Sequence, residues 1–501
     1  MGGKNILALL SAFLTCLIFP KANWFLIAFV ALVPLLLEFR KAKGKNLFLK
    51  GLLWGFIVQG YFHFWIFSLK AWAPLFAVFL IWLFFSFYLG LFYGVMFWLF
   101  GKLRSILYYE WTLPFFWIIF EWLRSLGPLG NSAGSLGYSQ TSNLPLLQLA
   151  SIFGVFGVSF YLVLVNVLIY WLLVKKDKKK IAVSLLIILV LPILWGSVRL
   201  MLHQNDGIKQ YEVAIIQGNH SENEKRDIKL FNAIKKDYFH LSEVALKDKP
   251  DLIFWPETIV STLNLADQNF ITRLLDFTRV HDVGIVLGTP IEKERKIYNA
   301  AALVSTNEIS DEIYFKNQLM PFGEYIPFRP LLSTFVNLTF LGTDYSRGTE
   351  KTLLKYKDLT LGGGICLESI YPWHYRNLTK NGADLLFVLV NNAWFFQSAA
   401  AAEHLQMSVL RAVENNRYLI QSGNTGISAI ISNTGEVLLK SNLDQTEILS
   451  MKVAAIKKNS IYYYLGDILI IFSIILIGFI LIVKYKTKKK NKYYKSYVIS
   501  H

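Results

Sequence analysis

The chain has 501 residues, of which 54% are hydrophobic and 17% are charged. Its 51 Lys and Arg residues against 34 Asp and Glu residues give a formal net charge of +17. So apolar a composition excludes an intrinsically disordered chain and exceeds what one soluble core requires. A strongly basic chain also raises the question of a nucleic-acid partner, so the location of the charges decides what they mean.

Eight apolar runs are long enough to approach or cross a hydrocarbon core of about 30 Å. They predict a polytopic α-helical membrane region with about eight transmembrane helices. Lys4 before the first run is also typical of a signal peptide, but no small-x-small cleavage motif follows, so we expect an uncleaved span. The runs are Asn5–Pro20, Trp24–Phe39, Asn46–Leu69, Leu75–Phe100, Trp111–Leu126, Leu146–Val174, Ile181–Leu200 and Tyr462–Val483.

Basic residues gather at alternate ends of these runs, as expected when loops face the cytoplasm and the exterior in turn. The segment between the seventh and eighth runs, Leu200–Tyr463, holds 27 basic and 29 acidic residues and is close to neutral. The positive charge therefore reflects membrane topology and gives no support for nucleic acid. Both termini are predicted to be cytoplasmic and the long segment exoplasmic. The predicted units are a transmembrane domain of seven helices (1–200), an exoplasmic domain (201–460), an eighth helix (461–484) and a basic cytoplasmic tail (485–501).

From Tyr211 onwards, short apolar runs alternate with amphipathic stretches. This alternation predicts an α/β layered fold, and about 260 residues form one ordinary domain. Expected helices are Lys229–Leu246, Asp267–His281 and Ser398–Arg417. Expected strands are Val213–Gln217, Leu252–Trp255, Gly284–Leu287, Ala300–Ser305, Leu359–Ile365, Leu385–Val390 and Ile427–Ser432.

The chain has two cysteines, Cys16 in the first apolar run and Cys366 in the exoplasmic segment, so we expect two free thiols. Cys366 follows an apolar strand at a possible helix start, where the helix dipole would lower the pKa of the thiol. The competing interpretation is a buried, inert cysteine. Neither a phosphate-binding loop around Gly362–Gly364 nor a metal-ligand spacing appears, and we expect no cofactor and no metal.

A carboxylate also follows a predicted strand, since Glu257 comes directly after Asp251–Pro256, and Lys316 and Glu324 flank an apolar loop. Acyl transfer through a thioester needs a carboxylate that takes the thiol proton, a thiolate that attacks and an ammonium that stabilises the oxyanion. By position alone, Glu257 is equally suited to capping a helix and Lys316 to a solvated surface.

Four motifs together resemble the nitrilase, or carbon–nitrogen hydrolase, superfamily with its Glu-Lys-Cys triad. They are Trp255-Pro-Glu257, the Lys316–Glu324 loop, Gly364-Ile-Cys366-Leu-Glu368 and Asn391-Asn-Ala-Trp394-Phe395. In the apolar region, Glu121-Trp-Leu-Arg124 and Leu136-Gly-Tyr-Ser-Gln140 extend this to a resemblance to the apolipoprotein N-acyltransferase family over nearly the whole chain. The resemblance implies an α-β-β-α sandwich beside the membrane helices.

The resemblance also implies a function: a bacterial inner-membrane enzyme with its catalytic domain in the periplasm. It would move an acyl chain from a phospholipid donor onto Cys366, and then to the α-amino group of the S-diacylglyceryl cysteine that begins an apolipoprotein. It assigns Glu257 as general base, Lys316 as oxyanion stabiliser and Cys366 as nucleophile. It gives supporting roles to Glu324, Glu368 and Trp394. A membrane-embedded monomer without cofactors is expected.

The chain departs from the family pattern at Asn392, where Asp is usual, at Leu367, where an aromatic residue is common, and in His220–Lys229, which lacks a tryptophan. Two alternatives stay open. One is a membrane-anchored amidase that passes the acyl group to water. The other is a transporter or lipid-binding scaffold whose exoplasmic domain is inactive.

Some expectations concern the membrane directly. The polar residues Glu121, Arg124, His63 and Asn166 lie inside apolar runs, where such residues are costly and often functional. Because Glu121 and Arg124 are three residues apart, we expect them to form a structural ion pair. The apolar stretches expected to reach the bilayer from the exoplasmic side are Leu331–Val336 and Trp394–Phe396 with Ala399–Ala402.

Overall fold

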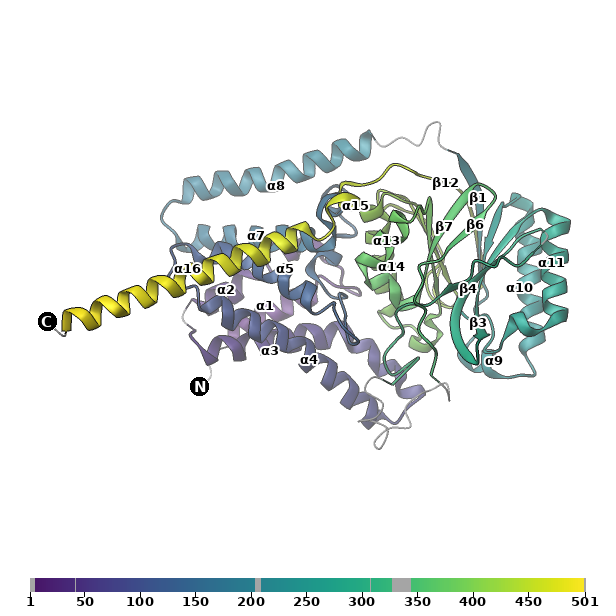
Figure 1. Cartoon of the computed structure of the whole chain (residues 1–501), viewed down its shortest axis with the longest axis horizontal. Coiled ribbons are helices and arrows are strands. Elements are labelled where there is room, and N and C mark those ends of the chain that lie inside the picture. The colour runs from purple at the N-terminus through teal and green to yellow at the C-terminus, as the bar shows by residue number, and fades with distance from the viewer. Residues whose placement is uncertain (1–4, 41, 203–208, 307, 327–343, 500–501) are drawn as a thin grey trace.

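The computed structural model of the chain describes residues 5–40, 42–202, 209–306, 308–326 and 344–499, with the side chains of residues 488–499 left out. Figure 1 shows apolar helices gathered at one end of the molecule and two β-sheets with their covering helices at the other. We call these parts the helical region (α1 to α8, with α15 and α16) and the sandwich (β1 to β12 with α9 to α14).

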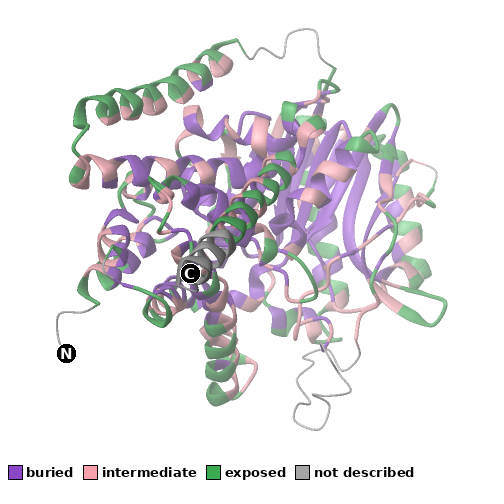
Figure 2. Cartoon of the chain, turned by 60° about the vertical axis from the view of Figure 1, so that its left-hand side comes forward, coloured by how far each residue is buried: buried purple, intermediate pink, exposed green. Residues whose placement is uncertain are grey.

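Within the described residues, five helices are long and apolar enough to cross a membrane. Only 6% of the apolar stretch of α8 and 17% of that of α16 is buried, and Figure 2 shows α8 mostly exposed along its length. Such apolar exposure is unfavourable in water and is typical of helices that face lipid. The five are α3 with η2 (Lys45–Phe62 and His63–Ala71), α4 (Leu75–Gly101), α7 (Ala150–Val174), α8 (Lys178–Met201) and α16 (Ile468–Ile499).

The other expected spans are helical but short. At 11 residues each, α1 (Ile6–Cys16) and α5 (Leu113–Leu123) are about 16 Å long, which is less than the hydrocarbon thickness. The second run is divided into η1 (Phe25–Phe29) and α2 (Val33–Phe39), and a proline begins α2. Further short elements are η3 (Tyr109–Thr112), η4 (Leu136–Gln140), α6 (Leu144–Leu147) and α15 (Ile461–Leu465).

The expected ion pair between Glu121 and Arg124 is wrong, because each side chain has other partners. Glu121 Oε1 accepts from Trp117 Nε1 and from the Leu136 amide, both at 2.9 Å. The Arg124 guanidinium bonds the loop after α5, with Nη1 2.7 Å from the Asn131 carbonyl. The two buried side chains therefore bond to separate partners, Glu121 to Trp117 and Leu136 and Arg124 to the loop after α5.

The sandwich contains two six-stranded sheets, in the orders β12-β1-β2-β3-β4-β5 and β11-β10-β9-β8-β7-β6. β1, β2 and β3 are parallel, as are β7, β8 and β9. Apolar side chains from the facing sheets form a shared core, in which the rings of Phe254 and Phe387 are 5.9 Å apart. The strands are β1 (Gln210–Gln217), β2 (Leu252–Phe254), β3 (Gly284–Lys293), β4 (Lys296–Val304), β5 (Tyr314–Phe315), β6 (Leu353–Tyr356), β7 (Leu359–Ile365), β8 (Leu385–Val390), β9 (Leu419–Gly423), β10 (Ala429–Ile431), β11 (Val437–Lys440) and β12 (Glu447–Ala454).

Helices cover both outer faces, which confirms the expected α-β-β-α layering. α10 (Phe231–Ala245) and α11 (Gln268–His281) cover the first sheet, and α13 (Pro372–Lys380) and α14 (Ala400–Asn415) cover the second. Figure 1 shows α13 and α14 between their sheet and the helical region. The remaining short helices are α9 (Glu222–Arg226), η5 (Leu246–Asp248), η6 (Asn264–Ala266), η7 (Cys366–Ile370) and η8 (Asn392–Phe395).

One hydrophobic core joins the sandwich to the helical region. Tyr371, Leu378 and Leu410 of the sandwich belong to the same buried cluster as Val155 and Leu162 of α7. The sandwich is therefore packed on the helices, and the ends of its strands lie beside η2 and α4.

Candidate active site

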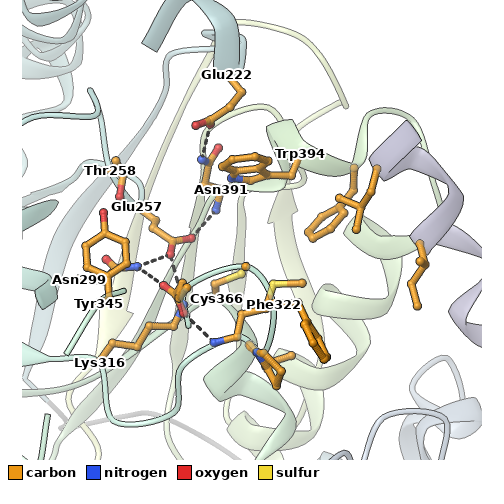
Figure 3. A pocket seen from close by; sticks show the side chains of 18 of the residues that line it. Glu222, Glu257, Thr258, Asn299, Lys316, Phe322, Tyr345, Cys366, Asn391 and Trp394 are labelled. Carbon is orange, nitrogen blue, oxygen red and sulfur yellow. Dashed lines mark hydrogen bonds and ion pairs between the residues drawn. The ribbon is translucent and has the colours of Figure 1, made fainter. Parts of the chain in front are cut away.

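The predicted site residues come from separate strands and meet in one place, as Figure 3 shows. Glu257 follows β2, Lys316 follows β5, and Cys366 follows β7 directly. Glu324 lies in the loop after Lys316. All four side chains are buried, at 1 to 8% exposure.

Lys316 lies between two carboxylates. Its Nζ is 2.9 Å from Glu324 Oε1 and 3.4 Å from Glu257 Oε1. Asn299 of β4 joins the same two oxygens, with Nδ2 2.7 Å from Glu257 and 2.8 Å from Glu324. Lys316 is therefore not a surface charge.

Glu257 is held from two further directions. The main-chain N–H of Asn391, the residue before η8, donates to Glu257 Oε2 at 2.9 Å. Gly288 of β3 lies so close that a Cβ there would come within 2.6 Å of the Glu257 Cα. Only glycine allows the two backbones to approach this closely.

Cys366 begins the short helix η7 in a strained conformation, with φ of +50°. Two more residues that line the same cavity, Thr258 (φ +49°) and Phe322 (φ +63°), share this left-handed conformation. Such conformations are unfavourable for residues other than glycine and gather at functional sites, where the surrounding fold imposes them. The thiol is 7% exposed and faces the cavity.

The expectation that a helix dipole lowers the pKa of Cys366 is wrong. Burial raises the pKa of the thiol well above its ordinary value, and the nearby Glu257 raises it further; Lys316 and a hydrogen bond from the Leu367 main chain oppose this only in part. A single 3₁₀ turn supplies too little dipole to compensate for burial. The thiol at rest is therefore protonated and needs a base.

Glu257 is suited to that role. Burial raises the pKa of its carboxyl above the ordinary value and Glu324 raises it further, while Lys316 and Asn299 hold it down. Burial alone would lower the pKa of Lys316, but Glu324 and Glu257 outweigh burial and raise it. Lys316 therefore stays positively charged beside the thiol.

Glu368 fixes the turn of Cys366 against the loop of Lys316. Its Oε1 accepts from the amides of Asn317 (2.7 Å) and Gln318 (2.9 Å). Its Oε2 accepts from the Tyr314 hydroxyl (2.6 Å) and the Ile365 amide (2.8 Å). Glu368 thus binds residues before and after Lys316 and the residue that precedes Cys366.

Trp394 joins the site to the helical region. The Arg226 guanidinium lies 4.7 Å from its ring centroid, and the ring of Trp72, just after η2, is 5.2 Å away. Arg226 belongs to His220–Lys229, the segment without a tryptophan, and its guanidinium contacts the rings of both Trp72 and Trp394. At the other departure, Asn392 Oδ1 lies 2.9 Å from His404 Nδ1.

The stretches expected to reach the bilayer contain both buried and exposed residues. Phe395 is buried and packs on Trp65 at 4.8 Å, and Ala400 and Ala401 are buried at the start of α14, so these residues belong to the core. Phe396 is 51% exposed. Leu331–Val336 lies outside the described residues.

A cavity of about 470 Å³ joins the Glu-Lys-Cys cluster to the helical region. One part of the cavity wall is formed by Glu257, Lys316, Glu324 and Cys366. Part of the remaining wall comes from the helical region, with Trp65, Ile66 and Leu69 of η2 and Ile81 and Phe85 of α4. Within the described part of the chain, no group of three or more His, Cys, Asp or Glu side chains is arranged to hold a metal ion.

Sequence reasoning missed several residues of the site. Asn299 binds both carboxylates from the middle of an ordinary strand, and Glu222 holds the Asn391 amide at 3.0 Å. Tyr345 lines the cavity from a segment without regular structure. Asn391 lay within a recognised motif, but the other three carry no local signal because only folding brings them to the site.

Comparison with known proteins identifies the family of the chain. Residues 11–168 match the family model of the apolipoprotein N-acyltransferase N-terminal domain, and residues 212–461 match that of carbon-nitrogen hydrolase.

Apolipoprotein N-acyltransferase from Geobacter metallireducens is 32% identical over 488 residues, covering 92% of each chain. Its counterpart from Coxiella burnetii is 29% identical, covering 94% of this chain and 99% of that one. The crystal structure of Saccharomyces cerevisiae Nit3, a member of branch 10 of the nitrilase superfamily, matches with 16% identity and a TM-score of 0.38, covering 49% of this chain and 90% of that one. The chain belongs to the apolipoprotein N-acyltransferase family.

Proposed function

We propose that this protein transfers a fatty acyl chain from a membrane phospholipid, through a thioester on Cys366, to the α-amino group of the N-terminal S-diacylglyceryl cysteine of an apolipoprotein. The observation that carries the proposal is the single cavity whose walls hold both the Glu-Lys-Cys cluster and apolar side chains of η2 and α4. A lipid acyl chain needs an apolar path to a nucleophile, and these helices supply one.

In the first half-reaction, Glu257 takes the proton from Cys366 Sγ and the thiolate attacks the ester carbonyl of the phospholipid. Lys316 stabilises the resulting oxyanion by charge. When the intermediate collapses, the C–O bond breaks and the lysophospholipid alkoxide leaves with the proton held by Glu257. The raised pKa of Glu257 suits a group that must both accept and return a proton.

In the second half-reaction, the α-amino group of the lipoprotein attacks the thioester carbonyl. Glu257 takes a proton from the attacking nitrogen, the C–S bond breaks, and the proton returns to Cys366 as the amide is released. The apolar cavity walls limit access of water, so transfer to the amine is favoured over hydrolysis.

We also propose a location and a division of the chain. Residues 1–200 and 461–484 form the membrane domain, 201–460 the catalytic domain and 485–501 a basic tail. Basic residues at alternate ends of the apolar runs support cytoplasmic termini and a periplasmic catalytic domain in the bacterial inner membrane. The protein acts as a monomer without a cofactor. Labelling of single introduced cysteines with a membrane-impermeant maleimide tests the orientation.

Mass spectrometry of the purified full-length protein after incubation with phospholipid vesicles tests the reaction. We expect a mass increase of one acyl group on Cys366, absent from Cys366→Ala and retained in Cys16→Ser, which removes the other thiol. A wild-type protein without this adduct would contradict the proposed chemistry.

The fate of the acyl-enzyme separates a transferase from an amidase. We expect the adduct to persist in buffer and to be discharged by a synthetic diacylglyceryl peptide with a free N-terminus. Rapid discharge in buffer alone would instead support hydrolysis.

A further inference from the structure

The turn that carries Cys366 is held from the helical region as well as from its own sheet. The Ile370 carbonyl, at the end of η7, accepts hydrogen bonds from the hydroxyls of Ser132 and Tyr138, both in the segment between α5 and α7. The Tyr371 hydroxyl donates to the Gly130 carbonyl at 2.8 Å. The far end of the nucleophile turn is therefore bonded across the interface between the two parts of the molecule.

Arg411 of α14 lies at the centre of this contact and is fully buried. Its Nη1 donates to the Ser369 carbonyl at 3.2 Å and lies 3.3 Å from the Tyr138 hydroxyl. Its Nη2 donates to Glu414 Oε1 at 2.8 Å. One guanidinium thus joins the turn of Cys366, the helical region and a buried carboxylate.

Glu414 extends the contact to α7. The same Oε1 accepts the main-chain N–H of Val155 at 2.8 Å. This N–H faces the carboxylate because α7 is broken at Gly154, whose φ of +66° is not helical. A Cβ on Gly154 would come within 2.7 Å of the Tyr462 ring, so glycine permits both the backbone angle and the close packing.

A buried ion pair of this kind is poorly explained by stability alone. Removing two charges from water is costly, and well-packed apolar residues of similar volume are often at least as stable. What the pair provides is direction, because the planar guanidinium fixes its partners in a defined geometry.

We propose that Arg411 and Glu414 are positioning residues that set the turn of Cys366 from the break in α7. This inference rests on the proposed function, in which Cys366 is the nucleophile. Because the two bonds to Arg411 and the bond to Val155 form one continuous path, the alignment of the thiol with Glu257 depends on the membrane helix.

Arg411→Met tests the proposal, with Arg417→Met as the matched control. Arg417 is also buried and lies two residues after the end of the same helix, but its bonds run to Ala383 and to the linker before α15 rather than to η7. Per folded protein, we expect Arg411→Met to slow thioester formation about 100-fold with an unchanged KM for the phospholipid, since small misplacements of a reacting group have effects of this size. Arg417→Met should keep the wild-type rate even where its Tm falls as far.

Val155→Pro tests the link to α7. Proline removes the main-chain N–H by which α7 reaches Glu414, and it is tolerated at the first residue after a helix break. We expect a lower kcat with unchanged KM, while Val155→Ala, which keeps the N–H, should have a smaller effect. Arg411→Lys, which keeps the charge without the planar fork, should restore only part of the rate.

The rate at which iodoacetamide alkylates Cys366 compares the same variants with the wild type in the absence of lipid. This measurement therefore tests the inference separately from the proposed function. A wild-type protein that forms no acyl adduct would contradict the function. The positioning role would be overturned if folded Arg411→Met and Val155→Pro proteins were acylated and alkylated as fast as the wild type. It would also be overturned if Arg417→Met lost as much of the acylation rate as Arg411→Met.

Discussion

Lys316 lies closer to Glu324 than to Glu257, with its Nζ 2.9 Å from the first carboxylate and 3.4 Å from the second. In the proposed mechanism, Glu324 takes the larger share of the lysine's charge and leaves Glu257 available as the base. A lysine that paired fully with Glu257 would favour its ionised form so strongly that it would accept the thiol proton poorly.

Glu324→Gln should therefore reduce thioester formation. Without the second carboxylate, Lys316 pairs with Glu257 alone and moves from the position in which it stabilises the oxyanion. We expect kcat to fall about 100-fold, the size of effect seen when an oxyanion donor is lost. Single-turnover acylation measures it, and Glu312→Gln, at an exposed ion pair with Lys355, is the control. Equal rates in the two variants would show that Glu324 does not position Lys316.

The pH dependence of acylation follows from the raised pKa of Glu257. Below that pKa the carboxyl holds a proton and cannot accept one from Cys366, so the rate falls on acidification. The ordinary pKa of Glu is about 4.3. Because the pKa of Glu257 is raised, the acylation rate begins to fall at a higher pH than this value would give.

Asn299→Ala should move this acidic limb to higher pH, because the Asn299 hydrogen bond lowers the pKa of Glu257. The pH profile of single-turnover acylation measures the shift, with the exposed Asn269→Ala as control. A limb that stays in place or moves to lower pH would contradict Glu257 as the base.

Glu368→Gln should weaken the fold as well as the site. The carboxylate accepts four hydrogen bonds, and an amide nitrogen in place of one oxygen leaves two buried donors unsatisfied. We expect the free energy of unfolding to fall by about 3 kcal/mol. The thermal midpoint in detergent measures this loss. Tyr314→Phe removes a single donor and should cost less; a Glu368→Gln protein as stable as the wild type would refute the bracing role.

Phe396→Ser tests the exposed aromatic residue beside the site. Since Phe396 is 51% exposed and follows a segment packed on η2, we expect it to contact lipid. The variant should acylate more slowly from bilayer phospholipid while keeping its rate with a soluble short-chain ester. Val280→Ser, at an exposed apolar residue of α11, is the control. Equal loss with both donors would argue against contact with lipid.

The fold could be predicted well where hydrophobic pattern decides it. β7 and β8 have the predicted bounds, and the helices α10, α11 and α14 lie within two residues of theirs. β5, β6, β9, β11 and β12 were not predicted, because short or partly exposed strands carry little alternation and are formed by pairing with neighbours. The helices α1 and α5 are shorter than the full spans that were expected. The composition of an apolar run shows that it is hydrophobic but does not show where its helix begins and ends.

The sequence by itself determined which residues can do the chemistry and on which part of the chain they lie. Glu257 and Cys366 follow predicted apolar strands, and the side chains of Glu257, Lys316 and Cys366 are those that thioester chemistry requires. Only the tertiary structure decided their electrostatics: burial reverses the shift expected for the pKa of Cys366, and distant Asn299 and Asn391 hold Glu257. It also separated Glu121 from Arg124. Residue types and periodicity are local properties, whereas desolvation and hydrogen-bond partners depend on which distant segments the fold brings together.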